Sequence, residues 1–414
     1  MTTATRSIAA AAVNIGAFRT AVKNIAATIP AKNRPEVAAR IRLTVNNDAL
    51  TVSHRGFDSY LAVTMPAENT TAGTAAFDGS YLNKSLATLL GGNSKTINEG
   101  SLELALEDEG LRTTFDGIDV TLEAVNDDKP EDEETSLGNP TPEHIATLAT
   151  VTAANLHDAY KRIKHAASND ETLPMLCAAN LTFGTKTITI HTTDRFRLAE
   201  LEMPAEITDE AREYGSQLFS AIDFKHLDNV LPNDDTEVTI SLAENGNRNT
   251  RYLRFDTAST TIIFTTVDAD FPNVAPLWPR TVNHAVTVNR ADMKRAVAKM
   301  KKMNEGNRVF LTSTASGLEM RVNLAGGGTA KVDLDSTIVH TNDYGEFLFA
   351  LNPDYLADAV AAFDTDMLTL AMTESARPVV ILDGSHEINP HPEELRLPGD
   401  ATHLELLMPV RMPS

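Results

Sequence analysis

Residue types that often carry enzyme chemistry are present in this sequence, but not in the spacing that catalysis needs. The three glycines at 326–328 are not followed by the pair Lys-Ser or Lys-Thr, which predicts a turn rather than a phosphate-binding loop. His386 and His391 could be a metal pair, but prolines flank His391 and no cysteine accompanies them, so we expect a loop without metal. No carboxylate pair or nucleophile motif stands out. The sequence therefore predicts no catalytic site, no metal and no cofactor.

Basic side chains gather on segments with a helical pattern, where they could contact phosphate groups. The net charge of -21 taken alone argues against a nucleic-acid partner. The acidic excess, however, lies outside these basic segments, for example at 103–123 in expected strands and hairpins and at 127–134 in an expected linker. Apart from Tyr160, no aromatic residue lies among the basic ones, which favours sequence-independent contact with the DNA backbone over base stacking. The candidate DNA-facing residues are Lys23, Arg34, Lys161, Arg162, Lys164, Lys294, Arg295, Lys299 and Lys302. The alternative is that these side chains merely cover solvated helix faces.

The elements that would position these side chains recur three times along the chain. Segments 14–29, 152–167 and 288–303 share a helical spacing of apolar residues and begin about 137 residues apart. A second helical trio spans 77–90, 219–231 and 351–363, and each member has an Asp or Asn near its start that suits a helix cap. Alternating strands follow each of them. This order predicts an α+β fold of three repeated domains, each with two helices packed on antiparallel sheets. Three unrelated α+β domains are the alternative.

The predicted domains span residues 1–141, 142–281 and 282–414. Segment 126–142 is acidic and contains proline, which is typical of a linker, and 279–284 marks the second junction. We expect the first twelve residues to be a frayed leader rather than a secretory signal. No apolar run reaches the roughly 20 residues that cross a bilayer, so no membrane partner is expected. The single cysteine, Cys177, fits a reducing cytoplasm.

Three local motifs add a family resemblance to this architecture. They are 193–199 (TDRFRLA), 270–279 (DFPNVAPLWP) and 406–411 (LLMPVR). Two weaker matches are 352–356 (NPDYL) and 173–176 (LPML). Together with the threefold repeat, which covers nearly the whole chain, these motifs resemble the bacterial β sliding clamp, the processivity subunit of DNA polymerase III.

The resemblance implies a ring made by head-to-tail association of two subunits, with helices lining the hole and sheets on the outside. Such a ring can be acidic overall while its lumen is basic. The implied partners are a second copy of the chain, double-stranded DNA, the replicative polymerase, the clamp loader, and repair and mismatch proteins that carry clamp-binding peptides. The implied role is tethering without catalysis.

The resemblance also implies a pocket for hydrophobic partner peptides between the second and third domains. An apolar cleft with a methionine floor could adapt to different side chains, and an arginine could orient the peptide backbone or carboxylate. The family usually has glycine and histidine where this chain has Arg195 and Phe196, and a basic residue where it has Pro276. A clamp-like variant that confers inhibitor resistance or sequesters partners therefore stays an alternative. The matching pocket positions are Leu176, Thr193, Arg197, Leu198, Pro272, Leu277, Leu406, Leu407, Met408, Pro409, Val410 and Arg411.

Overall fold

The computed structural model describes residues 7–29, 39–56, 58–91, 94–107, 110–125, 144–245, 250–279, 281–314, 317–340, 347–386, 389–391, 394–396 and 401–411. Contacts divide the chain into two compact units. Unit 1 comprises Met1–His157, Ala205–Tyr214 and Ile222–Thr266, and unit 2 comprises Asp158–Pro204, Gly215–Ala221 and Val267–Ser414. Within the described residues, no helix is long and apolar enough to span a membrane.

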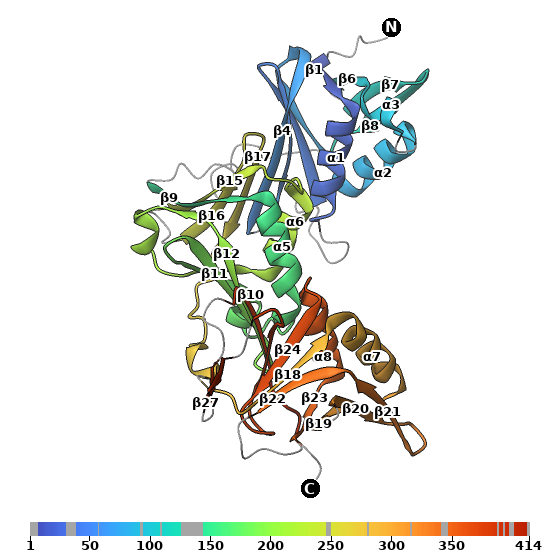
Figure 1. Ribbon diagram of the computed structural model, residues 1–414. Coiled ribbons are helices and arrows are strands. Elements are labelled where there is room, and N and C mark those ends of the chain that lie inside the picture. Colours follow the sequence, from blue (N-terminus) through green and yellow to red (C-terminus); the bar gives the residue numbers. More distant parts are fainter. Residues whose placement is uncertain are drawn as a thin grey trace. The chain divides into compact units, whose positions relative to one another are not determined.

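One antiparallel sheet organises unit 1 (Figure 1). Its path runs β13-β9-β15-β16-β17-β4-β1-β6-β7-β8, with β2, β3 and β5 attached beside β4. Pairing of β17 with β4 makes the sheet continuous between the first and second predicted domains. The strands are β1 (Ser7–Asn14), β2 (Arg40–Asn46), β3 (Ala49–Arg55), β4 (Ser59–Thr71), β5 (Gly73–Asp78), β6 (Ser101–Glu107), β7 (Gly110–Phe115), β8 (Ile118–Glu123), β9 (His144–Thr152), β13 (Glu206–Ile207), β15 (Glu237–Asn245), β16 (Thr250–Asp256) and β17 (Thr260–Thr265).

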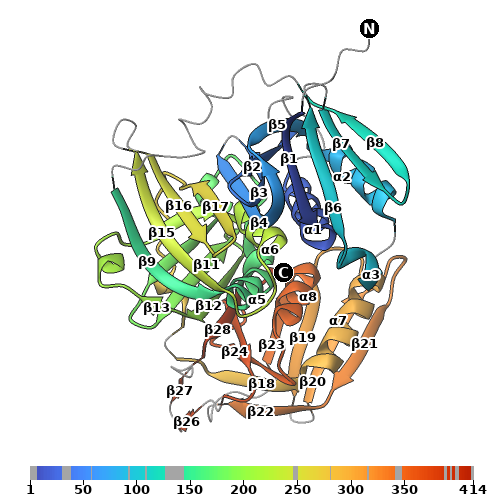
Figure 2. The ribbon, with the colours of Figure 1, turned by 90° about the horizontal axis from the view of Figure 1, so that it is seen from above.

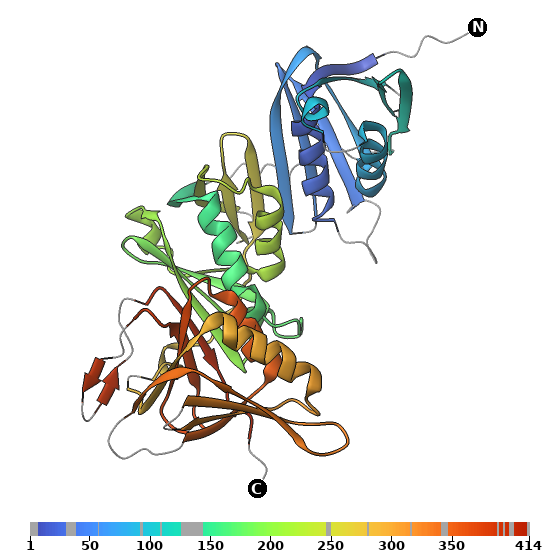
Figure 3. The same ribbon diagram turned by 45° about the vertical axis from the view of Figure 1, so that its right-hand side comes forward.

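The helices of unit 1 begin where the sequence supplies caps. Asn14 accepts a hydrogen bond from the Ala17 N–H and starts α1 (Ile15–Ala26), and Asp78 accepts one from Tyr81 and starts α2 (Gly79–Leu90). Figure 3 shows these two helices, coloured blue, side by side against the strands. Their apolar faces, which include the fully buried Phe18, form one hydrophobic core with strands β1 to β8. The other helices are α3 (Lys95–Asn98), η5 (Glu210–Arg212), α6 (Ala221–Val230) and α5 (Ala153–Ile163), which ends in unit 2.

The expected frayed leader is wrong for residues 7–12. These residues belong to β1, which pairs with β4 on one side and β6 on the other. Ala9, Ala11 and Val13 are buried in alternation, because their small side chains fit beneath α1 and α2. The strand was missed because its sequence is rich in alanine and has few bulky apolar residues. The expected linker, 126–142, lies outside the described residues.

Unit 2 contains several antiparallel sheets, and the largest of them joins strands of the second and third predicted domains. Its largest sheet has the order β14-β10-β11-β12-β28-β25-β24-β18-β22, and a smaller one has the order β21-β20-β19-β23. Figure 2 shows α7 and α8 side by side, next to β19 and β20 of the smaller sheet. The strands are β10 (Ala178–Phe183), β11 (Thr187–Thr193), β12 (Arg197–Pro204), β14 (Gln217–Ser220), β18 (His284–Asn289), β19 (Val309–Thr314), β20 (Gly317–Asn323), β21 (Thr329–Leu334), β22 (Ser336–His340), β23 (Phe347–Leu351), β24 (Met367–Met372), β25 (Val379–Asp383), β26 (Asn389–His391), β27 (Glu394–Arg396) and β28 (His403–Leu407). The helices are α7 (Arg290–Met303), α8 (Pro353–Ala362), η3 (Lys164–Ala166), η4 (Pro174–Leu176) and η6 (Ala275–Leu277).

The α+β class and the order of helix, strands, helix and strands are confirmed in all three repeats. The cap at Asn352 starts α8 as the sequence predicts, and Asn289 caps α7 in the same way. The glycines at 326–328 form a turn between β20 and β21, and all three have positive φ. The two compact units share the residues of the middle predicted domain between them, so the three domain boundaries stay a prediction.

Asp223 does not have the capping role expected for an acidic residue near the start of the second helix. It lies inside the first turn of α6, where its side chain is only 14% exposed. Burial, followed by the nearby negative charge of Asp58, raises the pKa of Asp223 to about 7. Burial also lowers the pKa of His226 to about 4, helped by His54 and Lys225. The 3.7 Å contact between Asp223 and His226 is therefore not an ion pair near pH 6, where both groups are neutral.

We expect Asp223→Asn to stabilise the protein in alkaline solution. Because the folded state holds this proton up to about pH 7, the native carboxyl favours folding below its unfolded pKa of 3.8 and loses that contribution as the pH rises through 7. The amide removes the cost of ionisation, so the free energy of unfolding at about pH 8 rises by up to ~3 kcal/mol. Denaturant unfolding at about pH 5 and 8 measures this change. Asp209→Asn, at an exposed position, is the control, and an unchanged pH dependence in Asp223→Asn contradicts the assignment.

Candidate partner-binding site and basic helices

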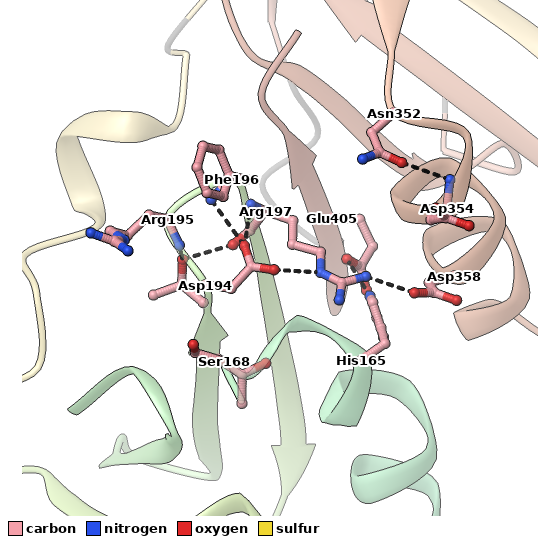
Figure 4. Close-up of polar contacts among 12 residues, drawn as sticks. His165, Ser168, Asp194, Arg195, Phe196, Arg197, Asn352, Asp354, Asp358 and Glu405 are labelled. Atoms are coloured by element: carbon pink, nitrogen blue, oxygen red, sulfur yellow. Dashed lines mark hydrogen bonds and ion pairs between the residues drawn. The ribbon is translucent and has the colours of Figure 1, made fainter. Parts of the chain in front are cut away.

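A tight turn between β11 and β12 presents an aromatic side chain to solvent. The Asp194 carboxylate accepts hydrogen bonds from the backbone N–H groups of Phe196, at 2.9 Å, and Arg197, at 3.0 Å. The Thr193 hydroxyl donates to the carbonyl of Arg197 and accepts from the N–H of Arg195. These bonds hold the turn in one conformation (Figure 4). Phe196 is 54% exposed, so this hydrogen-bonded turn holds an aromatic ring in solvent.

Arg195 occupies a backbone conformation that glycine adopts more easily. Its φ is +80°, in the left-handed region where a Cβ atom is crowded. The family that the sequence resembles usually has glycine at this position, and glycine adopts a positive φ without crowding because it has no Cβ atom. The hydrogen bonds of the turn keep Arg195 in this strained conformation.

We expect Arg195→Gly to raise the free energy of unfolding by about 1 kcal/mol, because it relieves the left-handed strain. Arg212→Gly, at an exposed arginine with negative φ, has the opposite expected sign, since glycine there only adds freedom to the unfolded chain. Denaturant unfolding of both variants beside the wild type decides the matter. Equal destabilisation by the two substitutions contradicts the strain argument.

The C-terminal strand β28 lies directly against this turn. In the pairing of β12 with β28, Leu198 is opposite Leu406 and Arg197 is opposite Leu407. Leu198, Leu406 and Val274 form a small apolar cluster, against which Phe271 and Trp278 pack partly buried. Beyond the strand, the Met408 N–H donates to the carbonyl of Phe196 at 2.8 Å, and the Val410 N–H donates to Ala350. Three distant motifs of the sequence therefore meet in unit 2.

The predicted pocket residues separate into a buried support and an exposed surface. Leu277 is 44% exposed and Met408 37% exposed, and Pro272 and Arg411 are exposed as well. Pro409 and Val410 are partly buried. Leu176 is buried in η4 and is not a member of the Leu198 cluster. The buried predicted residues are Leu176, Thr193, Leu198, Leu406 and Leu407. Phe196, Phe271, Val274 and Trp278 were missed as site residues, although the aromatic content of segment 270–279 was a signal for two of them.

Arg197 has protein partners where a peptide-orienting role was expected. Its Nε donates to Asp194 at 2.9 Å and its Nη1 to Asp358 of α8 at 2.7 Å (Figure 4). The guanidinium also lies 4.4 Å from the centre of the Tyr355 ring, and the side chain is only 12% exposed. Arg197 therefore connects the turn to α8, and the contacts of its side chain are mainly internal.

The basic residues of the second repeat are paired with acidic neighbours. Lys161 contacts Asp364 at 2.6 Å, and Arg162 contacts Asp158 at 2.6 Å and Asp364 at 3.9 Å. The hydrogen bond from Lys161 lowers the pKa of Asp364, which keeps this carboxylate ionised beside the helix. Lys164 lies 4.9 Å above the Tyr160 ring. The positive charge at the end of α5 is thus partly neutralised, which the sequence did not indicate because Asp364 belongs to another repeat.

Helix α7 carries the strongest exposed positive charge. Lys294, Lys299 and Lys302 are exposed and form no ion pair with another residue that the structure describes. Arg295 pairs with Asp292, one turn earlier in the helix. Lys23 is exposed near the end of α1. Arg34 lies outside the described residues.

Across the residues with described positions, no group of three or more His, Cys, Asp and Glu side chains is placed to hold a metal ion. His386 lies in the turn after β25, where its N–H donates to Asp383, and His391 lies in β26. The two histidines therefore carry no argument for metal chemistry.

Comparisons with known proteins agree with the motifs. The model for the central domain of the DNA polymerase III beta subunit matches residues 150–273, and the model for its C-terminal domain matches 276–391. A curated relative, the beta sliding clamp of Streptomyces coelicolor, is 23% identical over 396 residues, which cover 95% of this chain and 96% of the relative. A solved beta subunit from Thermotoga maritima has a TM-score of 0.81 at 17% identity, with 98% of this chain and 100% of that chain covered.

A sliding clamp from Bartonella birtlesii, solved with bound griselimycin, has a TM-score of 0.80 at 18% identity, and the match covers 97% of this chain and 99% of that chain. The structural matches show the sliding-clamp fold, and the two domain models of one family together match more than half of the sequence. The chain therefore belongs to the family of bacterial DNA polymerase III beta subunits, the sliding clamps of DNA replication.

Proposed function

We propose that two copies of this chain close head to tail into a ring around double-stranded DNA and tether the replicative polymerase, with no catalytic step of their own. The clamp loader would open and close the ring, and repair and mismatch proteins would share the partner surface. The observation that carries the ring in this chain is a pair of different unpaired sheet edges, one in each unit.

The first edge is β8 and the second is β21. Among the described strands, β8 pairs only with β7 and β21 pairs only with β20, so each leaves backbone N–H and C=O groups unpaired on one side. Ile118 of β8 is 56% exposed. Beside β21, Met303 of α7 is 42% exposed. With Lys331 and Val332 it lines an open pocket of about 500 Å³. Two unlike surfaces on one chain support a head-to-tail contact, which forms a ring when it closes.

Charge placement supports duplex DNA as the encircled partner. The exposed lysines of α7 and α1 offer positive charge to phosphate groups without reading bases. The acidic Glu103 and Glu107 of β6 and Asp119 of β8 lie on strands of unit 1. Lys161 and Arg162 would contribute less, because Asp364 lies beside both of them. Weak contacts suffice for sliding, since a closed ring is held by its topology.

The surface around Phe196, Leu277 and Met408 supports a hydrophobic peptide as the partner segment. These are large apolar side chains that stay exposed, and the Leu198 cluster beneath them keeps the surface rigid. A methionine at such a surface adapts to different apolar side chains. Phe196 in place of the family's usual histidine adds apolar area, which favours partner peptides with an aromatic residue.

Sedimentation at micromolar concentration tests the assembly. We expect a mass twice the 44.8 kDa of one chain. A mass equal to one chain at this concentration contradicts the proposed ring.

A further inference from the structure

A fully buried carboxylate lies beneath the proposed partner surface. Glu405 of β28 is 0% exposed, and its two oxygens accept hydrogen bonds from different histidines. His165 of η3 lies 3.0 Å from Oε2, and His403 of the same strand lies 3.1 Å from Oε1. The His403 ring is stacked on Phe363, with the ring centres 4.2 Å apart. An unpaired carboxylate at such a site is costly, so these donors determine whether the strand packs well.

Other charged groups surround this trio from each neighbouring element. Arg197 of β12 and Asp358 of α8 both act on His165, with opposite signs. Arg197 in turn contacts Asp194 of the exposed turn. Lys164 precedes His165 on its own element and is exposed. Figure 4 shows His165, Glu405 and Arg197 close together between β12, β28 and α8.

The balance of these effects favours a charged pair. Burial alone disfavours the imidazolium, yet the charge and hydrogen bond of Glu405 raise the pKa of His165 above its usual 6.5. Burial likewise disfavours the carboxylate, yet His165, and then His403, lower the pKa of Glu405 below its usual 4.5. The contact therefore favours the form in which His165 is protonated and Glu405 is ionised. The pair is complete below the pKa of His165 and loses its positive member as the pH rises through that value.

The strand carries this pair on one face and the partner surface on the other. His403, Glu405 and Leu407 share the face toward the core, while Leu406 on the opposite face belongs to the Leu198 cluster. Met408, the first residue after β28, is part of the exposed surface. We propose that the protonated His165–Glu405 pair positions β28 for partner peptides, so that peptide affinity falls as the solution becomes alkaline. This inference rests on the proposed peptide-binding function, and His165 and Glu405 are positioning residues within it.

The wild-type protein provides the first test. The probe is a fluorescein-labelled synthetic peptide with the clamp-binding segment of the replicative polymerase from the same cell, and fluorescence anisotropy gives its Kd between about pH 6 and 9. We expect Kd to increase about tenfold over this range. Because binding and protonation are linked, NMR titration of His165 must then show a pKa that is higher with saturating peptide than without it. Equal pKa values in the two states overturn the proposal.

Glu405→Gln provides the second test, because the amide keeps the size of the side chain and removes its charge. We expect weaker binding at about pH 6 and a flat pH profile. His157→Gln is the matched control: His157 also contacts a carboxylate, Asp228 at 2.7 Å, but belongs to unit 1. The control should keep the wild-type profile. If Glu405→Gln does not fold, the wild-type titration still decides.

Different results would contradict the partner surface and the positioning role of the His165–Glu405 pair. If the wild-type protein does not bind the peptide at any pH, the proposed partner surface is wrong. If it binds with the same Kd across the range, or if Glu405→Gln keeps the wild-type profile, the partner surface stands and the positioning role of the pair is wrong.

Discussion

Removal of residues 408–414 is expected to abolish binding of the polymerase-derived peptide while the dimer stays intact. The deletion removes the exposed Met408 side chain and the backbone contacts from Met408 to Phe196 and from Val410 to Ala350. It leaves Leu406 and Leu407 in β28, so the sheet keeps its pairing with β12 and β25. Because the deletion removes both the Met408 side chain and the backbone segment that holds it in place, it should weaken peptide binding by more than about 100-fold. Fluorescence anisotropy measures this change.

Sedimentation of the same variant controls for assembly, and Met408→Ala separates the side chain from the backbone. The single substitution is expected to weaken binding by about tenfold, since it truncates one contact and leaves the backbone hydrogen bonds. Wild-type affinity in the deletion variant would show that the partner surface lies elsewhere.

The second large effect is expected at the edges formed by β8 and β21. Ile118→Asp on β8 and Met303→Asp beside β21 each place a charge on an exposed apolar residue, so folding should be little affected. Burial of that charge in a subunit contact is costly, and each variant should sediment as a monomer. Ile145→Asp is the control, because Ile145 is 46% exposed on β9, which is neither of the two proposed contact strands.

Mixing the two variants distinguishes the kinds of assembly. In a head-to-tail ring, the intact β8 edge of Met303→Asp can still meet the intact β21 edge of Ile118→Asp, so the mixture should form an open dimer through one contact. A symmetric contact of β8 with β8 would instead leave Met303→Asp dimeric when it is alone. That result would exclude the head-to-tail arrangement.

Much of the fold was readable from the sequence because local signals and packing agree in the helices. The apolar spacing of Phe18, Val22 and Ile25 predicted the buried face of α1, and the residues that cap α2 and α8 were visible as Asp78 and Asn352. Strand β1 was missed because its alternation uses alanines, which carry little pattern. Asp223 was misread because it lies on the buried side of α6 near the charge of Asp58, a residue distant in the sequence.

The sequence identified the motifs that form the candidate site, but it did not show which of their side chains contact one another. The strings around Arg197, Leu277 and Leu406 meet in one unit, but which side chains are buried depends on the pairing of β12 with β28. Asp358, one of the two acidic partners of Arg197, and Asp364, the partner of Lys161, belong to another repeat, and no local pattern connects them to these basic residues. Glu405 reads as the polar position of an alternating strand, and only the packing of η3 against it shows a buried charge.

Retention on DNA of different topology tests the proposed ring most directly. Labelled protein is assembled by clamp loader and ATP on a nicked circular plasmid, and half of the sample is then cut once with a restriction enzyme before gel filtration. A ring that encloses the duplex stays with the circle and slides off the ends of the linear form. Equal retention on both forms would show direct binding without encirclement, and peptide binding without retention on the circle would favour a partner-sequestering variant.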